Sequence, residues 1–227
     1  MNFPTPQLNE VISSREGLVS VYGSFGVGKT TFALQTALKS AKIGNNVLYF
    51  YSKPNFPSQR LDSLLKVEST DFLDNINFLR ITSFNELFTV IFNLEFLILN
   101  NLKEKHSSLN LIIIDSLSEL YRIELNPYKK EKNFNMNYRL NQILATLYYF
   151  LETYGTEILV INELSRKSKD NIVFETQSGG KIVDFWIKTI IKIERTDILN
   201  LRKIIIRKIY ENQIIEFLSK LTKQGFE

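Results

Sequence analysis

The sequence predicts an α/β fold with a mainly parallel central sheet flanked by helices and an antiparallel strand extension at the C-terminal end. Three observations support this prediction. Short β-rich runs alternate with helical patterns over residues 18–162. These runs are continuously apolar, which is typical of parallel strands covered on both faces. From residue 187 onward, strand-like runs follow one another without a helix between them, as in an antiparallel sheet.

The elements of the first half follow from the spacing of apolar residues. A strand is expected at residues 18–22, and residues 31–41 place apolar side chains at helical spacing. Further strands are expected at residues 47–51 and 78–81, and a long apolar helix at residues 85–102.

The second half continues the alternation of strand and helix. The clearest buried strand covers residues 111–115, a helix is expected at residues 137–154, and another strand at residues 157–162. The antiparallel extension is expected to contain strands at residues 187–194, 203–209 and 214–218. No repeat, low-complexity tract or linker interrupts the chain, so a single domain over residues 1–227 is expected.

The composition narrows the class of protein. Hydrophobic residues at 44% and charged residues at 23% are ordinary values for a globular chain. The absence of cysteine and the single histidine exclude a disulfide framework and a Cys- or His-based metal centre. The chain shows no signal-peptide pattern and no apolar run of membrane-spanning length, which predicts a cytoplasmic protein without membrane contact.

The strongest motif is a glycine-rich loop between the first strand and the first long helix. It reads G-x-x-x-x-G-K-T and consists of Gly23, Ser24, Phe25, Gly26, Val27, Gly28, Lys29 and Thr30. Glycines let backbone N–H groups converge on an anion, and the helix that follows adds free N–H donors at its N-terminus. Lys29 is expected to reach the terminal phosphates of a nucleotide, and the Thr30 hydroxyl to bind Mg²⁺. The motif therefore predicts a phosphate loop.

A carboxylate at the end of a buried strand is the second part of such a site. Asp115 ends the apolar run at residues 111–115. Carboxylate and hydroxyl oxygens suit a hard cation such as Mg²⁺. We therefore expect Asp115 and Thr30 to share a magnesium ion.

With both motifs placed, the chain resembles the RecA/RadA recombinase superfamily, and within it the archaeal RadA paralogues of the RadB kind, which keep only the ATPase core. The resemblance extends from residue 17 to residue 226. It is carried by segments 22–31, 47–53, 57–61, 114–117, 161–164 and 179–186. It implies a RecA-like P-loop NTPase core that binds ATP and Mg²⁺, with Thr31 joining the phosphate loop.

The resemblance also implies roles for individual residues. Arg60 would lie against the adenine base. Segments 128–133 and 166–178 would be the two DNA-facing loops, and single-stranded DNA and a RadA-type recombinase the partners. The basic side chains expected to bind DNA are Lys129, Lys130, Lys132, Arg166, Lys167 and Lys169.

The chain departs from the family pattern at the catalytic position. Lys53 stands where active relatives have the glutamate that deprotonates the attacking water, and a lysine ammonium has no acceptor. General-base help is worth about 10²–10⁴-fold in rate, so weak or absent ATP hydrolysis is expected. Glu163 is the obvious carboxylate to substitute for the missing glutamate. It replaces the glutamine that senses the γ-phosphate in relatives, and we hypothesise an ion pair between Lys53 and Glu163. The expected catalytic set is thus Lys29, Lys53 and Glu163.

A second departure concerns assembly. RadA-type filaments use an F-x-x-A hook that follows a small DNA-binding domain. Here residues 3–6 read F-P-T-P, without the alanine, and residues 1–16 are too few for that domain. A long self-assembled filament is therefore not expected.

Two interpretations of function remain open. The first is an ATP-binding paralogue that assists or regulates homologous recombination or DNA repair. It predicts binding to single-stranded DNA that weakens as salt rises. The second is a KaiC-like, nucleotide-gated regulatory ATPase that does not bind DNA. A small-molecule kinase is less well supported, because the sequence shows no acceptor-binding signature and no Arg-rich lid.

Overall fold

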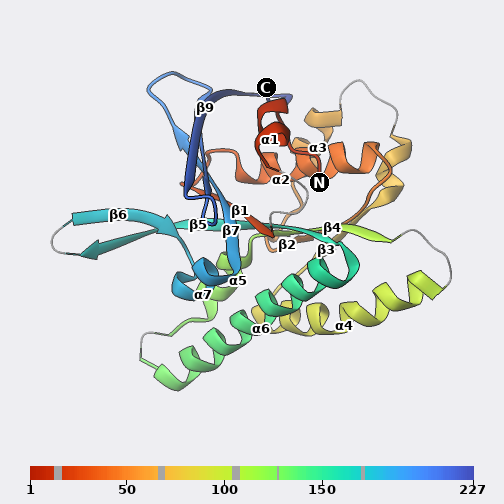
Figure 1. Ribbon diagram of the computed structural model, residues 1–227, viewed down its shortest axis with the longest axis vertical. Helices are drawn as coiled ribbons and strands as arrows, with labels where there is room; N and C mark the ends of the chain where they lie inside the picture. The colour runs from red at the N-terminus through yellow and green to blue at the C-terminus, as the bar shows by residue number, and fades with distance from the viewer. Residues whose placement is uncertain (13–16, 66–69, 104–107, 127, 170–171) are drawn as a thin grey trace.

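The computed structural model describes residues 1–12, 17–65, 70–103, 108–126, 128–169 and 172–227 (Figure 1). Its elements in chain order are α1 (Pro6–Val11), β1 (Leu18–Gly23), α2 (Lys29–Lys42), β2 (Asn46–Tyr51), α3 (Ser58–Leu65), the 3₁₀ helix η1 (Asp71–Asn75), β3 (Ile76–Arg80), α4 (Phe84–Lys103), β4 (Leu109–Asp115), α5 (Leu117–Glu124), α6 (Lys130–Tyr154), β5 (Glu157–Lys169), β6 (Ile172–Gln177), α7 (Gly180–Trp186), β7 (Ile187–Arg195), β8 (Leu201–Lys208), β9 (Gln213–Thr222) and β10 (Gly225–Phe226).

One sheet runs through the described elements. Its strand order is β10-β9-β8-β7-β1-β5-β4-β2-β3, and β6 pairs with β5 beside this path. The pairs from β7 to β3 are parallel, whereas β7–β8, β8–β9, β9–β10 and β5–β6 are antiparallel. The predicted parallel sheet with an antiparallel C-terminal extension is confirmed.

Helices cover both faces of the sheet (Figure 1). On one face, α1 and α2 enclose a core that includes Phe32, Leu34 and Tyr49. On the other, α4, α5, α6 and α7 enclose a second core that includes Ile91 and Leu147. Each such side chain contributes about 1.5–3 kcal/mol relative to an exposed one, so both layers stabilise the sheet.

The parallel strands bring the motifs to one edge. In the β1–β5 register Gly23 lies beside Glu163, and in the β2–β4 register Tyr51 lies beside Asp115. The same carboxyl-terminal edge therefore carries the phosphate loop and the segments after β2 and β4. Ligands of open α/β sheets bind at such an edge.

Two elements extend furthest beyond their predicted bounds. The helix expected from residue 137 begins at Lys130, and the strand expected to end at residue 162 continues to Lys169. Lysine and glutamate favour helix, but the first turns of α6 are exposed, and its first buried residue is Met136. No apolar periodicity therefore marked this start. Helices α1, α5 and α7 were not predicted, because they are too short to show a clear period.

Among the helices in the described ranges, none is both long enough and apolar enough to cross a membrane.

Candidate nucleotide-binding site

The phosphate loop connects the end of β1 to the start of α2, and its glycines meet two different demands. Gly26 and Gly28 have φ angles of 75° and 110°, a backbone conformation that residues with a Cβ rarely adopt. At Gly23 the constraint is contact, because a Cβ would lie 2.3 Å from the carbonyl oxygen of Ile193 in β7. The glycine pattern in the sequence is therefore required by the geometry.

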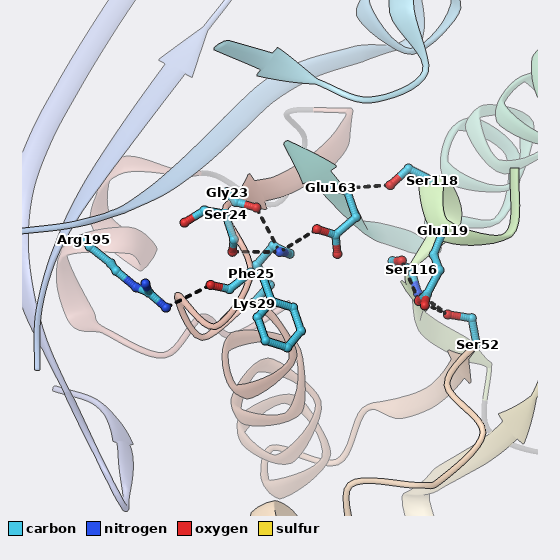
Figure 2. Close-up of polar contacts among 10 residues, drawn as sticks. All are labelled: Gly23, Ser24, Phe25, Lys29, Ser52, Ser116, Ser118, Glu119, Glu163 and Arg195. Atoms are coloured by element: carbon cyan, nitrogen blue, oxygen red, sulfur yellow. Dashed lines mark hydrogen bonds and ion pairs between the residues drawn. The ribbon is translucent and has the colours of Figure 1, made fainter. Parts of the chain in front are cut away.

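Lys29 lies at the first position of α2 and is only 7% exposed. Its Nζ donates to the carbonyls of Gly23 at 2.9 Å and Ser24 at 3.1 Å. It also donates to Glu163 Oε2 at 3.1 Å (Figure 2). The Lys29 side chain is thus folded back over the phosphate loop, next to the expected position of the phosphates.

Two arginines of the antiparallel extension hold the other side of the loop. Arg195 donates to the carbonyl of Phe25 at 3.0 Å, and Arg202 donates to the carbonyl of Val27 at 3.2 Å (Figure 2 shows the first of these). Desolvation and the nearby Arg195 charge lower the pKa of Arg202. When carbonyls are held outward, adjacent N–H groups are left to face an anion.

Asp115 and Thr30 supply the oxygen atoms expected for magnesium. Asp115 is 5% exposed and accepts a hydrogen bond from the Tyr49 hydroxyl at 2.9 Å. Burial raises the pKa of Asp115, while hydrogen bonds from Thr30 and Tyr49 and the charges of Lys53 and Lys29 oppose that rise. A cation would relieve this desolvated carboxylate, and a carboxylate with a hydroxyl is a donor set that suits Mg²⁺.

The cavity beside the loop has a volume of about 520 Å³. Its lining residues from the expected site are Phe25, Gly26, Gly28, Lys29, Thr30, Thr31, Lys53, Arg60, Asp115 and Glu163. The structure therefore brings the expected magnesium and catalytic residues and most of the expected nucleotide residues around one space, whereas Gly23, Ser24 and Val27 do not line it. Asn200, Leu221, Thr222 and Lys223 complete its wall.

Arg60 links three parts of this wall. Its guanidinium donates to Thr31 Oγ1 at 2.8 Å and to the carbonyls of Lys223 at 3.0 Å and Thr222 at 3.1 Å. The buried Gln35 of α2 fixes the end of the C-terminal segment, residues 221–226, to which Thr222 and Lys223 belong. It donates to the carbonyl of Phe226 at 3.4 Å and accepts from the Phe226 N–H at 2.7 Å.

The expected ion pair between Lys53 and Glu163 does not form in this structure. Glu163 pairs with Lys29 instead, whereas the exposed Lys53 lines the cavity from the end of β2. The β1–β5 register explains the difference, because it places Glu163 beside Gly23, where the phosphate loop starts.

A further carboxylate joins the ends of β2 and β4. Glu119, in the first turn of α5, accepts a hydrogen bond from the Ser52 hydroxyl at 2.8 Å (Figure 2). Ser52 Oγ also accepts from the Ser116 N–H at 3.2 Å. Glu119 therefore holds the residue before Lys53 against the residue after Asp115.

Apart from Lys129, the residues expected to bind DNA lie on α6 or β5, so the expectation that both segments are loops is wrong. Lys130 and Lys132 are exposed at the start of α6, and Lys129 is at the N-cap position of that helix without a side-chain capping hydrogen bond. Beside them, Tyr128 and Phe134 are 95% and 71% exposed.

The second segment forms the β5–β6 hairpin, which extends from the body of the molecule in Figure 1. Arg166 is exposed and pairs with Glu175 at 3.4 Å, a surface contact worth about 0–1 kcal/mol that leaves it accessible to a phosphate. The main chain of Lys167 and Lys169 is part of β5, but the structure does not describe their side chains.

Several site residues were missed by sequence reasoning. Arg195, Arg202, Gln35 and Glu119 reach the site from elements whose neighbours are set by sheet register and helix docking. Only Glu119 carried a local signal, as a second carboxylate four positions after Asp115.

Comparison with known proteins agrees with this geometry. The Rad51 family model matches residues 8–209. The DNA repair and recombination protein RadB of Methanococcus maripaludis (strain C5 / ATCC BAA-1333) is 29% identical over 86% of this chain and 82% of its own length. The proteins of that name from Methanosphaera stadtmanae and Methanocaldococcus jannaschii are 28% and 24% identical, over 79% and 83% of this chain and 73% and 84% of their own lengths. These matches confirm the resemblance to the RadB-like members of the RecA/RadA superfamily, and the chain belongs to the Rad51 family.

Proposed function

We propose that this protein binds Mg²⁺-ATP at the phosphate loop, hydrolyses it slowly and acts in DNA recombination and repair. The observation that carries the proposal is the gathering of Lys29, Thr30, Asp115 and Arg60 around one cavity. The RadB relatives are named DNA repair and recombination proteins, which supports the same role. The continuous sheet supports a single folding unit over residues 1–227.

The chain's own groups would divide the work of binding. The N–H groups of the loop and the Lys29 ammonium would hold the phosphates, and Arg60 would lie near the base. Thr30 and Asp115 would hold Mg²⁺, which neutralises phosphate charge when bound. Lys53 lines the cavity but has no acceptor in its charged form, so it would bind phosphate rather than activate water.

DNA is the expected second ligand. Exposed lysines and aromatics at the start of α6 offer the combination of phosphate pairing and base stacking that suits single-stranded DNA. Arg166 on the β5–β6 hairpin adds a further accessible cation. A RadA-type recombinase is the protein partner that we propose, since the chain belongs to the same superfamily.

The proposal is tested by two binding measurements. Calorimetry should show Mg²⁺-ATP binding that Lys29→Ala weakens by at least about tenfold, because a buried charge contact to phosphate is lost. Fluorescence anisotropy should show single-stranded DNA binding that weakens with salt, and a Lys130→Ala/Lys132→Ala variant should have a shallower salt slope.

The outcomes separate the two functions. Failure of the protein to bind ATP would contradict the proposed nucleotide site. ATP binding without DNA binding at any salt concentration would favour the KaiC-like regulatory ATPase. Lys220→Ala, which removes one exposed lysine of β9, is compared with the single variant Lys130→Ala as a charge-matched pair for the DNA measurement.

A further inference from the structure

Glu163 lies at the point where three parts of the site meet. Its carboxylate contacts Lys29, and its residue pairs with Gly23 across the β1–β5 ladder. Its main-chain N–H donates to Ser118 Oγ at 2.7 Å, and its carbonyl accepts from the Ser178 N–H at 2.9 Å. The backbone that carries this carboxylate is therefore fixed on both sides, and its place beside Lys29 is a built feature of the site.

Lys29 has no donor to spare. An ammonium group has three N–H donors, and here the three acceptors are two loop carbonyls and the Glu163 carboxylate. A phosphate oxygen that binds Lys29 must take the place of one acceptor or share the ammonium with it. The carbonyls belong to the loop itself, so the competing group with a full negative charge is Glu163.

This arrangement has a consequence for the form in which a nucleotide binds. A terminal phosphate without metal would bring several negative charges close to the Glu163 carboxylate, at a site that is only partly exposed to solvent. Like charges at that distance repel strongly when water does not screen them fully. A divalent cation on Thr30 and Asp115 would offset this repulsion.

We propose that Glu163 is a built-in counter-ion of Lys29 that makes the site selective for magnesium-complexed nucleotide over metal-free nucleotide. This inference rests on the proposed function of the cavity as a nucleotide site. It assigns to Glu163 the role of a specificity-determining residue, and it follows from the contact with Lys29. Removing the charge while keeping the shape should make the site tolerant of metal-free ATP.

The test compares the affinity for ATP in excess Mg²⁺ with the affinity in EDTA. For each protein, the dissociation constant in EDTA divided by the dissociation constant in Mg²⁺ measures the dependence on metal. We expect Glu163→Gln to lower this ratio by roughly tenfold, mainly through tighter binding in EDTA. Glu163→Asp keeps the charge and should keep most of the dependence.

A matched control removes one negative charge elsewhere. Glu216→Gln lies on β9, where Glu216 pairs with Lys203 outside the nucleotide cavity, and it should leave the ratio as in the unmodified protein. Circular dichroism of each variant checks that the fold is retained.

The outcomes are distinct. An unchanged ratio in Glu163→Gln, or an equal change in Glu216→Gln, would overturn the counter-ion role while leaving the nucleotide site intact. If neither the unmodified protein nor Glu163→Gln binds ATP with or without Mg²⁺, the proposed function fails, and this inference fails with it.

Discussion

The guanidinium of Arg195 donates a 3.0 Å hydrogen bond to the main-chain carbonyl of Phe25, across a sequence separation of 170 residues. The end of β7 thereby supports the tip of the phosphate loop. A Cβ at Gly26 would lie 2.8 Å from the same guanidinium, so the loop packs closely against it. The conformation of the loop thus depends on a residue from the other half of the chain.

Arg195→Ala is therefore expected to weaken Mg²⁺-ATP binding. A hydrogen bond from a charged group is worth about 1.5–3 kcal/mol when protected, and the exposure of Arg195 reduces this to a loss of roughly 3–10-fold in affinity. Calorimetry measures the change. Arg207→Ala, on β8 and away from the loop, is the matched control, and equal losses in both variants would contradict the role of Arg195.

Asp115→Asn is expected to stabilise the fold while weakening magnesium-dependent nucleotide binding. Burial raises the pKa of Asp115, so the folded protein holds this proton more tightly than the unfolded chain does. At low pH the bound proton stabilises the folded state. This stabilisation is lost as pH rises from the pKa of Asp115 in the unfolded chain through its higher pKa in the folded protein.

At neutral pH the variant should therefore have the higher melting temperature, by roughly 2–4 °C. The difference should shrink as pH falls through the raised pKa of Asp115, because the aspartate of the unmodified protein then binds its proton. Thermal unfolding at several pH values measures this. A lower melting temperature for Asp115→Asn at pH 7 would show that the carboxylate is better compensated than its burial implies.

Lys53→Glu is expected to raise ATP turnover. The side chain lines the cavity from the end of β2, and a carboxylate there would provide the acceptor that lysine lacks. General-base help is worth about 10²–10⁴-fold, and even about tenfold would be detected by release of inorganic phosphate. Lys223→Glu, at another lysine that lines the cavity, serves as the control for charge alone. Equal turnover in Lys53→Glu and the unmodified protein would mean that the missing base does not limit hydrolysis.

Gln35→Ala is expected to loosen the wall formed by residues 221–226. Its side-chain amide both donates to and accepts from the main chain of Phe226, and it donates to the carbonyl of Gln224 at 3.3 Å. Leaving buried partners unpaired costs about 1–3 kcal/mol, which corresponds to a fall of roughly 2–10 °C in melting temperature. Gln213→Ala on the exposed start of β9 is the control. Faster proteolysis near residues 221–226 in Gln35→Ala alone would support the assignment.

Local signals predicted the parts of the site that depend on neighbouring residues. The phosphate loop is continuous in sequence, and Asp115 ends the apolar run that is the clearest predicted buried strand. The order of strands and helices followed from the same periodicity, because each buried segment must present apolar residues to the sheet or to its cover.

Contacts between distant elements could not be read in the same way. Glu163 meets Lys29 across 134 positions because β1 and β5 pair in one register, and a shift by one residue would turn its side chain to the other face. The start of α6 was missed for a different reason, since a helix end that projects into solvent needs no apolar face.

The residues that complete the nucleotide cavity are synthesised long after the phosphate loop. Gln35 and Phe226, which join α2 to the wall, are 191 positions apart. At the usual 5–20 residues per second, a ribosome needs roughly 10–40 s to make the residues between them. During that interval the phosphate loop has been synthesised, while the wall that Arg60 contacts has not. A nascent chain stalled before β9 should therefore lack full ATP affinity, because β9 and residues 223–226 must be made before this wall of the cavity can form.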